Sequence, residues 1–155
     1  MHGLAVFHFG TSGWSYAEWV GPFYDEKDRM FSFYSKLFKS VEIDSTFYRI
    51  PTKSQVYGYL RSSPKDFVFS AKMPKVLTHE KRLSLELGVK KDLWEYLELL
   101  EPLDKAGKMG AILIQLPPSF AYKRDRESIA GFLEILPEEY EFAVEFRNHS
   151  WFRDD

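Results

Sequence analysis

The sequence predicts an α/β protein made of repeated βα units around a parallel sheet, in the manner of a (β/α) barrel. Short apolar or β-branched runs alternate along the chain with longer segments of helical period, which is typical of such units. One run, Gly110–Leu116, is almost continuously apolar, as expected of a strand covered on both faces. Polar and ionisable residues recur near the carboxyl ends of the runs, where barrels carry their sites.

The first two strands flank a helix. A strand is expected at Phe7–Thr11, followed by a loop and by Asp28 as the N-cap of a helix. The apolar face of that helix comprises Met30, Phe31, Tyr34, Leu37 and Phe38. The second strand is expected at Ser40–Ser45.

The third unit begins with a helix capped by Thr52 and ended by Pro64, because proline cannot continue a helix. The third strand is expected at Phe67–Met73. A long loop that contains Thr78 and His79 follows it.

The remaining units follow the same order. A helix is expected from about Lys91 to Lys105, with Gly107 as its stop, and Gly110–Leu116 is the fourth strand. A helix from about Arg126 to Leu136 then leads to a fifth strand at Glu141–Arg147. The expectation is a single domain over residues 1–155.

Composition excludes several classes of function. The formal net charge of -2 gives no basic footprint for duplex nucleic acid, so no such partner is expected. The absence of cysteine excludes thiolate metal sites and cysteine nucleophiles. No run of about eighteen apolar residues occurs, so we expect a cytoplasmic protein without a membrane partner.

Side chains two residues apart share one face of a strand, and this rule collects polar groups on one face of four expected strands. These are Glu42 and Asp44, Lys72, Gln115, and Glu145 with Arg147. Their position at the carboxyl ends of the strands predicts a binding or catalytic site. The alternative is an ion-pair network that only neutralises itself.

Six ordered blocks of sequence carry a family resemblance. They are GTSGWSY at 10–16, FYD at 23–25, VEIDSTFYRIP at 41–51, FVFSAKMP at 67–74 followed by Thr78 and His79, GAILIQLPPSF at 110–120, and AVEFRNHSW at 143–151. Together they resemble the YecE-like family, also called domain of unknown function 72. The resemblance covers essentially the whole chain. It implies a TIM-barrel-like fold and no established activity.

Family members are longer, so the resemblance implies an incomplete barrel of about five of eight strands, the N-terminal part of the fold. Either the chain is a truncated or split product, or two chains combine. Exposed parallel edges at the first and fifth expected strands would invite pairing. We therefore expect a homo-oligomer, or a chain that is unstable alone.

The carboxylates are candidates for acid–base chemistry. Glu42 or Glu145 is expected to act as general base. Asp44 is a substrate-binding candidate, and the three carboxylates are also candidate ligands of a divalent metal, although no fixed ligand spacing supports a metal. Pairing with neighbouring cations is the alternative role.

Four basic or titratable residues complete the catalytic and anion-binding candidates. Lys72 is expected to stabilise negative charge rather than form a Schiff base, because carboxylates are expected nearby. Arg147 is expected to clamp a carboxylate or phosphate. His79 is a candidate proton shuttle, and His149 a loop residue that contacts substrate.

The remaining substrate-binding candidates are aromatic or amide side chains near the ends of strands. They are Trp14, Tyr16, Tyr48 and Gln115, with Phe47 and Trp151 as further aromatic lining. Aromatic rings there can line a pocket or stack on a sugar or base, and packing within the core is the alternative.

Two classes of function remain open. One is a hydrolase or lyase that acts on a small polar or anionic substrate. The other is a non-catalytic module that binds a small-molecule ligand, or a fragment that is inactive without a partner chain. Barrels host many unrelated reactions, so the fold does not decide between them.

Overall fold

The computed structural model describes residues 6–152 and shows an α/β fold. Its sheet contains β1 (Ser40–Ile43), β2 (Val68–Lys72), β3 (Met109–Gln115) and β4 (Phe142–Glu145). The α-helices are α1 (Met30–Leu37), α2 (Ser45–Tyr48), α3 (Lys53–Ser62), α4 (Val89–Lys105) and α5 (Tyr122–Leu133). Short 3₁₀-helices lie at Ala17–Trp19 (η1), Lys27–Arg29 (η2), Leu85–Leu87 (η4) and His149–Trp151 (η5), and a π-helix lies at Val76–Glu80 (η3).

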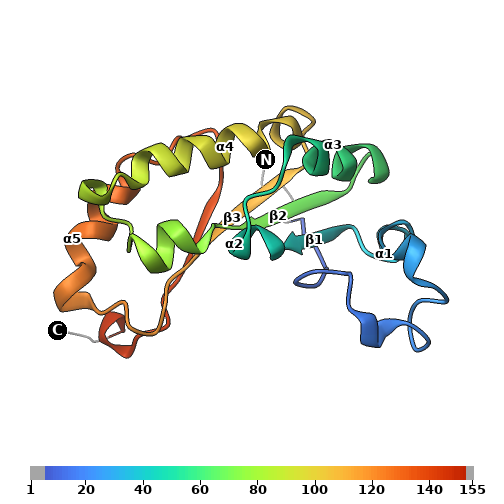
Figure 1. Cartoon of the computed structure of the whole chain (residues 1–155), viewed down its shortest axis with the longest axis horizontal. Helices are drawn as coiled ribbons and strands as arrows, with labels where there is room; N and C mark the ends of the chain where they lie inside the picture. Colours follow the sequence, from blue (N-terminus) through green and yellow to red (C-terminus); the bar gives the residue numbers. More distant parts are fainter. Residues whose placement is uncertain (1–5, 153–155) are drawn as a thin grey trace.

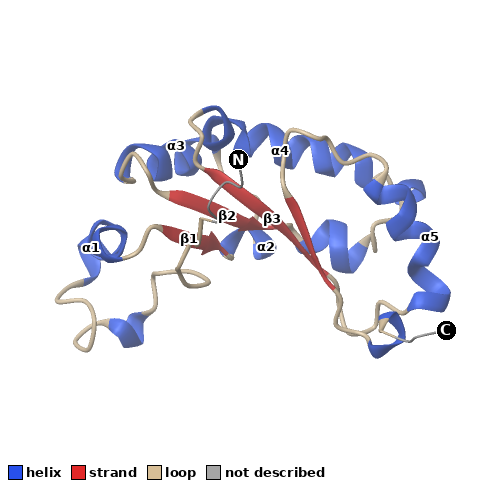
Figure 2. Ribbon diagram, turned by 180° about the vertical axis from the view of Figure 1, so that it is seen from behind, coloured by secondary structure: helices blue, strands red, loops and turns tan. Residues whose placement is uncertain are grey.

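The four strands are parallel and lie in the order β1-β2-β3-β4. Each connection between neighbouring strands passes through at least one helix, as parallel pairing requires. Figures 1 and 2, taken from opposite sides, show α3 and α4 along the same side of the sheet. The predicted parallel α/β class is therefore confirmed with four strands.

The core lies between the sheet and these helices. In β1 to β3 the helix-facing side chains are buried, whereas most of their neighbours on the other face stay partly exposed; in β4 the helix-facing Phe142 and Val144 are partly buried. Phe69 of β2 is fully buried and contacts the rings of Phe31, Tyr59 and Phe67. The opposite face carries small side chains, among them Ser70 and Ala111. The helix-facing side of the sheet therefore contributes most of the packed core.

Helix α3 begins as its sequence predicts. The Thr52 hydroxyl accepts a hydrogen bond from the backbone N–H of Gln55, whose side-chain oxygen accepts one from the backbone N–H of Thr52. This reciprocal capping box satisfies donors that would otherwise lack a partner at the start of the helix. By contrast, Asp28 lies within η2 and makes no capping hydrogen bond, so its predicted role is wrong.

The strand predicted at residues 7–11 is absent from the described part of the chain. Directly after this segment, Ser12 forms an isolated parallel bridge to Glu42. The buried Tyr34 hydroxyl lies 2.8 Å from the backbone N–H of Thr11, which donates to it, and 3.0 Å from the Ser40 carbonyl oxygen, to which it donates. A side chain therefore takes backbone groups that a longer ladder would use. Residues 6–11 stay irregular, and the prediction of five strands is corrected to four.

Backbone contact is nevertheless very close at Gly10. A Cβ atom at this position would lie 2.1 Å from the carbonyl oxygen of Ser40, far inside van der Waals distance. The segment before Ser12 therefore lies against β1 without pairing as a strand. Only glycine permits this approach.

Two elements after the strands differ from expectation. β1 ends at Ile43 rather than Ser45, because Asp44 adopts helical backbone angles and begins α2. The segment with Thr78 and His79, expected as a loop, is the π-helix η3. Short π-helical segments are rare and occur frequently at functional sites.

Helix α5 starts earlier than predicted, at Tyr122 instead of about residue 126, and ends at Leu133. The Asp125 carboxylate accepts a hydrogen bond of 2.7 Å from the backbone N–H of Ala121. This contact closes the first turn, which explains the earlier start. Within residues 6–152, no helix combines the length and the apolar character needed to cross a membrane.

Candidate functional site

Polar side chains form a row across the carboxyl edge of the sheet. Glu42 of β1 pairs in register with Ser70, and Lys72 lies two residues further along β2. Gln115, the last residue of β3, is in register with Glu145 of β4. The four strands therefore present a carboxylate, an ammonium, an amide and a second carboxylate on the face that the helices leave uncovered. We call these residues and Arg147 the polar row.

Glu42 and Lys72 form an ion pair. Their charged atoms lie 3.7 Å apart, and the two side chains are only 23% and 16% exposed, so solvent screens the pair incompletely. The Ser12 hydroxyl donates a hydrogen bond of 2.7 Å to Glu42 Oε1. Ser12 therefore ties the N-terminal segment to the polar row.

The backbone of Lys72 is held from the core. The Thr46 hydroxyl lies 2.6 Å from the Lys72 carbonyl oxygen, and the Tyr96 hydroxyl donates to the same oxygen at 3.1 Å. Complete burial raises the pKa of Tyr96, which keeps this hydroxyl protonated as a donor. Helices α2 and α4 thus both fix the end of β2.

At the other end of the polar row, Gln115 Nε2 donates a hydrogen bond of 2.9 Å to Glu145. Arg147 lies just beyond β4, and its Nε is 3.7 Å from the second oxygen of Glu145. Both members of this ion pair are more than two-fifths exposed. It is therefore a looser pair than that of Glu42 and Lys72.

His79 lies in η3, directly after β2. Its Nδ1 is 2.9 Å from the Thr78 hydroxyl, and its ring meets the Phe47 ring edge to face at 4.9 Å between centroids. Burial lowers the pKa of His79, and the charges of Arg147 and Arg82 lower it further. The imidazole is therefore neutral at pH 7 and can exchange a proton.

A clamp around Arg82 joins the segment just after η3 to Ser119, in the loop after β3, and to Asp125 of α5. Arg82 donates two hydrogen bonds to Asp125, at 3.1 and 2.8 Å, and others to the hydroxyl and carbonyl oxygens of Ser119. Arg82 and Leu83 have φ angles of 49° and 58°, which side chains with a Cβ adopt at a cost. The hydrogen bonds of Arg82 offset that cost and fix the segment.

Burial raises the pKa of Asp125, but hydrogen bonds from Arg82, Arg124 and the backbone of Ala121 outweigh it, so the net shift is downward. Asp125 is therefore ionised over the whole neutral range. None of the residues in this clamp was singled out from the sequence. The signal in the sequence that could have identified Asp125 is an ionisable residue within a helix that carries an apolar stripe.

Tyr16 and Asp44 lie at the acidic end of the polar row, beside Glu42. The Tyr16 hydroxyl donates to the carbonyl oxygen of Ser12, and burial followed by the charge of Asp44 raises the Tyr16 pKa. Asp44 Oδ1 lies 3.2 Å from the Cβ position of Gly13, whose φ of 73° suits glycine. These residues gather as the sequence predicts, although Asp44 starts a helix instead of extending β1.

Three other predicted contact residues stand apart. Trp14 packs edge to face on Phe31 and Tyr59, so it anchors the loop to the core. Tyr48 is 74% exposed, and His149 is exposed in η5. Neither makes a hydrogen bond or ion pair with the polar row among the described residues.

The further aromatic candidates also divide between packing and the site. Trp151 stacks on Phe120 and Phe146, whereas Phe47 lies between Lys72 and His79. The Lys72 Nζ is 5.9 Å from the centre of the Phe47 ring. Phe47 therefore bridges the middle of the polar row and η3.

The uncovered face of the sheet contains a hollow of about 620 Å³ that reaches Ser12 and Glu42 from the amino ends of the strands. Its wall is made largely of small side chains, including Ser70, Gly110 and Ala111. Between residues 6 and 152, no three His, Asp or Glu side chains gather closely enough to hold a metal ion. The geometry therefore gives the metal hypothesis no support.

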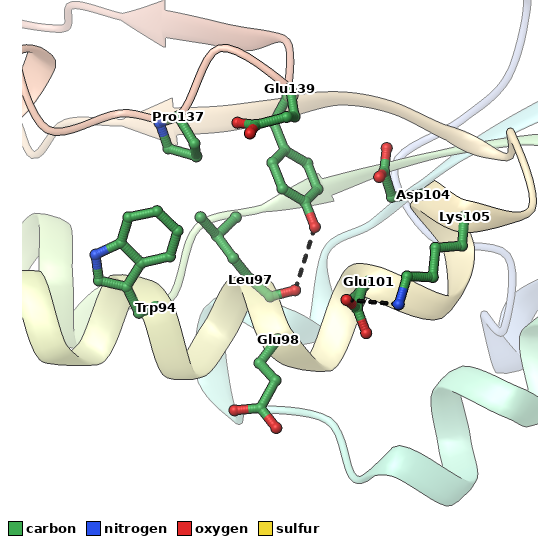
Figure 3. Close-up of a pocket in the computed structure, with 9 residues that line it drawn as sticks. Trp94, Leu97, Glu98, Glu101, Asp104, Lys105, Pro137 and Glu139 are labelled. Atoms are coloured by element: carbon green, nitrogen blue, oxygen red, sulfur yellow. Dashed lines mark hydrogen bonds and ion pairs between the residues drawn. The ribbon is translucent and has the colours of Figure 1, made fainter.

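A second hollow, of about 440 Å³, lies beside α4 and is drawn in Figure 3. Its acidic side chains are Glu98, Glu101, Asp104 and Glu139. Two of them already pair with lysines, Glu101 with Lys105 at 2.8 Å and Glu98 with Lys53 at 3.3 Å. No residue of the polar row lines this hollow, so it is separate from the candidate site.

Curated proteins from two bacteria are similar to this chain in sequence. It is 25% identical over 148 residues to the UPF0759 protein YunF of Bacillus subtilis (strain 168), which covers 95% of this chain and 52% of that protein. It is 27% identical over 147 residues to the UPF0759 protein YecE of Escherichia coli (strain K12), covering 95% and 50%. The chain spans about half the length of these curated relatives.

Solved structures of DUF72 family proteins are also similar to this chain. A crystal structure of a DUF72 family protein from Thermotoga maritima MSB8 matches with a TM-score of 0.77 and 33% identity, covering 95% of this chain and 58% of that one. A DUF72 family protein from Enterococcus faecalis V583 matches with a TM-score of 0.70 at 20% identity, covering 94% and 53%, which shows a shared fold. The family model described as "Protein of unknown function DUF72" matches residues 8–155. The chain belongs to this family, whose members named here carry no established activity.

Proposed function

We propose that the carboxyl edge of the sheet is the active site of a hydrolase or lyase for a small polar or anionic substrate. The observation that carries this proposal is the partly buried Glu42–Lys72 pair, held from both sides by the Ser12 hydroxyl and by the Thr46–Tyr96 contacts to the Lys72 backbone. Charged groups fixed in a shielded place are what electrostatic catalysis requires.

The roles follow from protonation states. Glu42 or Glu145 takes a proton from a water molecule or from the substrate. Lys72 and Arg147 stabilise the negative charge that then develops on a substrate oxygen. His79 takes up a proton first and then passes it to the leaving group, because its lowered pKa makes the imidazolium a ready proton donor.

We propose further that the four strands are the N-terminal part of a TIM-barrel-like fold and form one domain. Parallel order, helices along one side and polar residues at the carboxyl edge all support this. The staggered positions of Glu42, Lys72 and Gln115 on successive strands also fit the tilt of strands in a barrel.

The test is a substrate screen on the folded chain, with esters, phosphate esters, glycosides and hydroxy acids. Turnover should fall at least about a hundredfold in Glu42→Gln or Glu145→Gln, whichever residue is the base, because general-base catalysis contributes that much. Lys39→Met, which breaks an exposed pair with Asp66, is the control and should leave turnover unchanged. If all three variants keep the full rate of an observed turnover, the site assignment is wrong.

A second candidate is a ligand-binding module, or a fragment that acts only with a partner chain. Phe7 and Phe9 are 78% and 74% exposed beside β1, and β4 pairs only with β3 in the part of the chain that is described. Apolar side chains and an open parallel edge favour association, so we expect a homo-oligomer or a weakly stable monomer. A monomeric mass independent of concentration, together with cooperative unfolding, would contradict this expectation.

A further inference from the structure

The two ends of the polar row differ in the groups they offer to a ligand. At the β1 end, Glu42 and Asp44 present carboxylates, which accept hydrogen bonds. Beyond β4 and β2, Arg147 and His79 present N–H donors. Lys72 lies between the two ends.

We propose that this edge binds a small polyol that bears one anionic group, phosphate or carboxylate. The anionic group is held between His79 and Arg147, and the hydroxyl groups lie at Glu42 and Asp44. This inference rests on the proposed function in that it assigns a ligand to the same site, but it requires binding only and not turnover.

Arg147 has unused capacity to bind an anion. Its guanidinium carries five N–H donors, and within residues 6–152 none of them makes a hydrogen bond. The nearest carboxylate oxygen, on Glu145, is 3.7 Å from Nε, which is an ion pair but longer than a hydrogen bond. A planar phosphate or carboxylate edge can therefore bind it in bidentate fashion without displacing a protein contact.

The second ring nitrogen of His79, Nε2, makes no hydrogen bond to any described residue. The Thr78 hydroxyl is 2.9 Å from Nδ1 and 3.5 Å from the Pro74 carbonyl oxygen, at the limit of a hydrogen bond. The shorter contact takes the hydroxyl proton, so Nδ1 accepts and Nε2 carries the hydrogen of the neutral ring. Nε2–H is then a donor for an anion.

The charges around His79 favour an anion. Burial lowers its pKa most, and then Arg147, Arg82 and Lys75 lower it, while Glu80 alone among the principal neighbours raises it. Each of these cations repels a proton on the imidazole and attracts a negative group at the same place. The charges that act most strongly on His79 are therefore mainly positive.

The anion end is also rigid. The Arg82 clamp holds η3 to Asp125 and Ser119, and the edge-to-face contact with Phe47 limits rotation of the His79 ring. Binding groups that are already in place lose little conformational entropy when a ligand arrives.

The acidic end matches hydroxyl groups. The Asp44 carboxylate accepts no hydrogen bond from any described residue, and Glu42 accepts one, from Ser12. An ionised carboxylate has about four acceptor positions, so both can accept from the hydroxyls of a polyol. A single inorganic ion carries no sugar hydroxyl groups for the acidic end, so it can use the anion end alone.

The test is calorimetric titration of the folded chain with glucose 6-phosphate and with gluconate, each compared with glucose. At least one anionic sugar should bind about tenfold more tightly than glucose, since a charge-assisted hydrogen bond contributes about that factor. Arg147→Gln should remove this advantage, whereas Glu42→Gln should weaken glucose and the anionic sugars alike.

Arg61→Gln is the matched control, because Arg61 is an exposed arginine at the end of α3, which leads into the amino end of β2. It should leave all affinities unchanged. Inorganic phosphate should bind more weakly than glucose 6-phosphate and with the same dependence on Arg147. Arg147 is exposed and lacks hydrogen bonds to described residues, so its replacement should not unfold the chain, which circular dichroism checks.

Equal affinity for glucose and both anionic sugars overturns the inference, as does an Arg147→Gln variant that behaves like Arg61→Gln. Inorganic phosphate that binds as tightly as glucose 6-phosphate overturns the assignment of the hydroxyl end. Anion-selective binding without turnover of any substrate would uphold this inference and reject the enzyme. Turnover of neutral substrates without anion-selective binding would support the proposed enzyme and reject this inference.

Discussion

The two faces of the sheet carry different kinds of side chain. On the helix side, aromatic and aliphatic side chains such as Phe69 and Ile112 are fully buried. On the other side, the same strands carry small residues and the partly exposed polar row. Substitutions on the helix side should therefore change stability, and substitutions in the polar row should change binding or catalysis.

The largest effect is expected for Phe69→Ala. Its ring is fully buried against three other aromatic rings, so truncation leaves a cavity and should lower the free energy of unfolding by about 3–5 kcal/mol. Urea denaturation measures this. Leu113→Ala, on the other face of the neighbouring strand, is the control and should cost less, about 1–2 kcal/mol, because Leu113 is only partly buried. Equal losses would show that the two faces do not differ.

Asp125→Asn should have the next largest effect. It leaves the partly buried Arg82 guanidinium without its charge partner and should cost about 2 kcal/mol, less than for a fully buried pair because solvent reaches Arg82. Hydrogen exchange over η3 should accelerate as well. The control Asp66→Asn breaks an exposed pair with Lys39 and should cost less than about 0.5 kcal/mol. An unchanged exchange rate in η3 would show that the clamp does not hold this segment.

Lys72→Met should lower the free energy of unfolding by about 1–2 kcal/mol, because it leaves the partly buried Glu42 carboxylate without its charge partner. It should nevertheless abolish ligand binding or turnover at the carboxyl edge. Lys91→Met removes a charge from an exposed pair with Glu95 and should leave both properties unchanged. A large loss of stability in Lys72→Met would place this lysine among the structural residues instead.

The smallest effect concerns pH. The pKa of His79 is lowered on folding, so the unfolded chain binds more protons between the folded pKa and the unfolded value of about 6.5. The contribution of His79 to stability is therefore present above about pH 6.5 and is lost as the pH falls through the folded pKa. In His79→Gln, the decline of the melting temperature between about pH 7 and 5 should be shallower. Identical declines in the two proteins would contradict the lowered pKa.

Much of the architecture could be predicted from the sequence because local rules agree with tertiary contacts there. The strands β2 to β4 and the helix capped by Thr52 lie close to where apolar patterning and capping place them. The prediction of a strand at residues 7–11 was wrong because a distant side chain, the Tyr34 hydroxyl, takes backbone groups that β pairing would have used. Alternation of residues along a segment carries no information about such a competitor.

The polar row was predictable for the same reason, since strand alternation and parallel order place its members on one face. The contacts that hold the polar row in place could not be predicted from the sequence. Thr46 and Tyr96 meet at the Lys72 carbonyl oxygen from two helices, and Arg82 reaches Asp125 over 43 residues of chain. These contacts depend on how helices pack on the sheet, which periodicity does not specify.

The contact between Gly10 and Ser40 has a consequence for mutational tolerance. Even the methyl group of alanine at position 10 would force the N-terminal segment away from β1. Ser12 would then lose Glu42, and Tyr16 would move away from Asp44. In a library of random variants, position 10 would therefore be as intolerant as a residue that touches the ligand, although glycine has no side chain with which to touch anything.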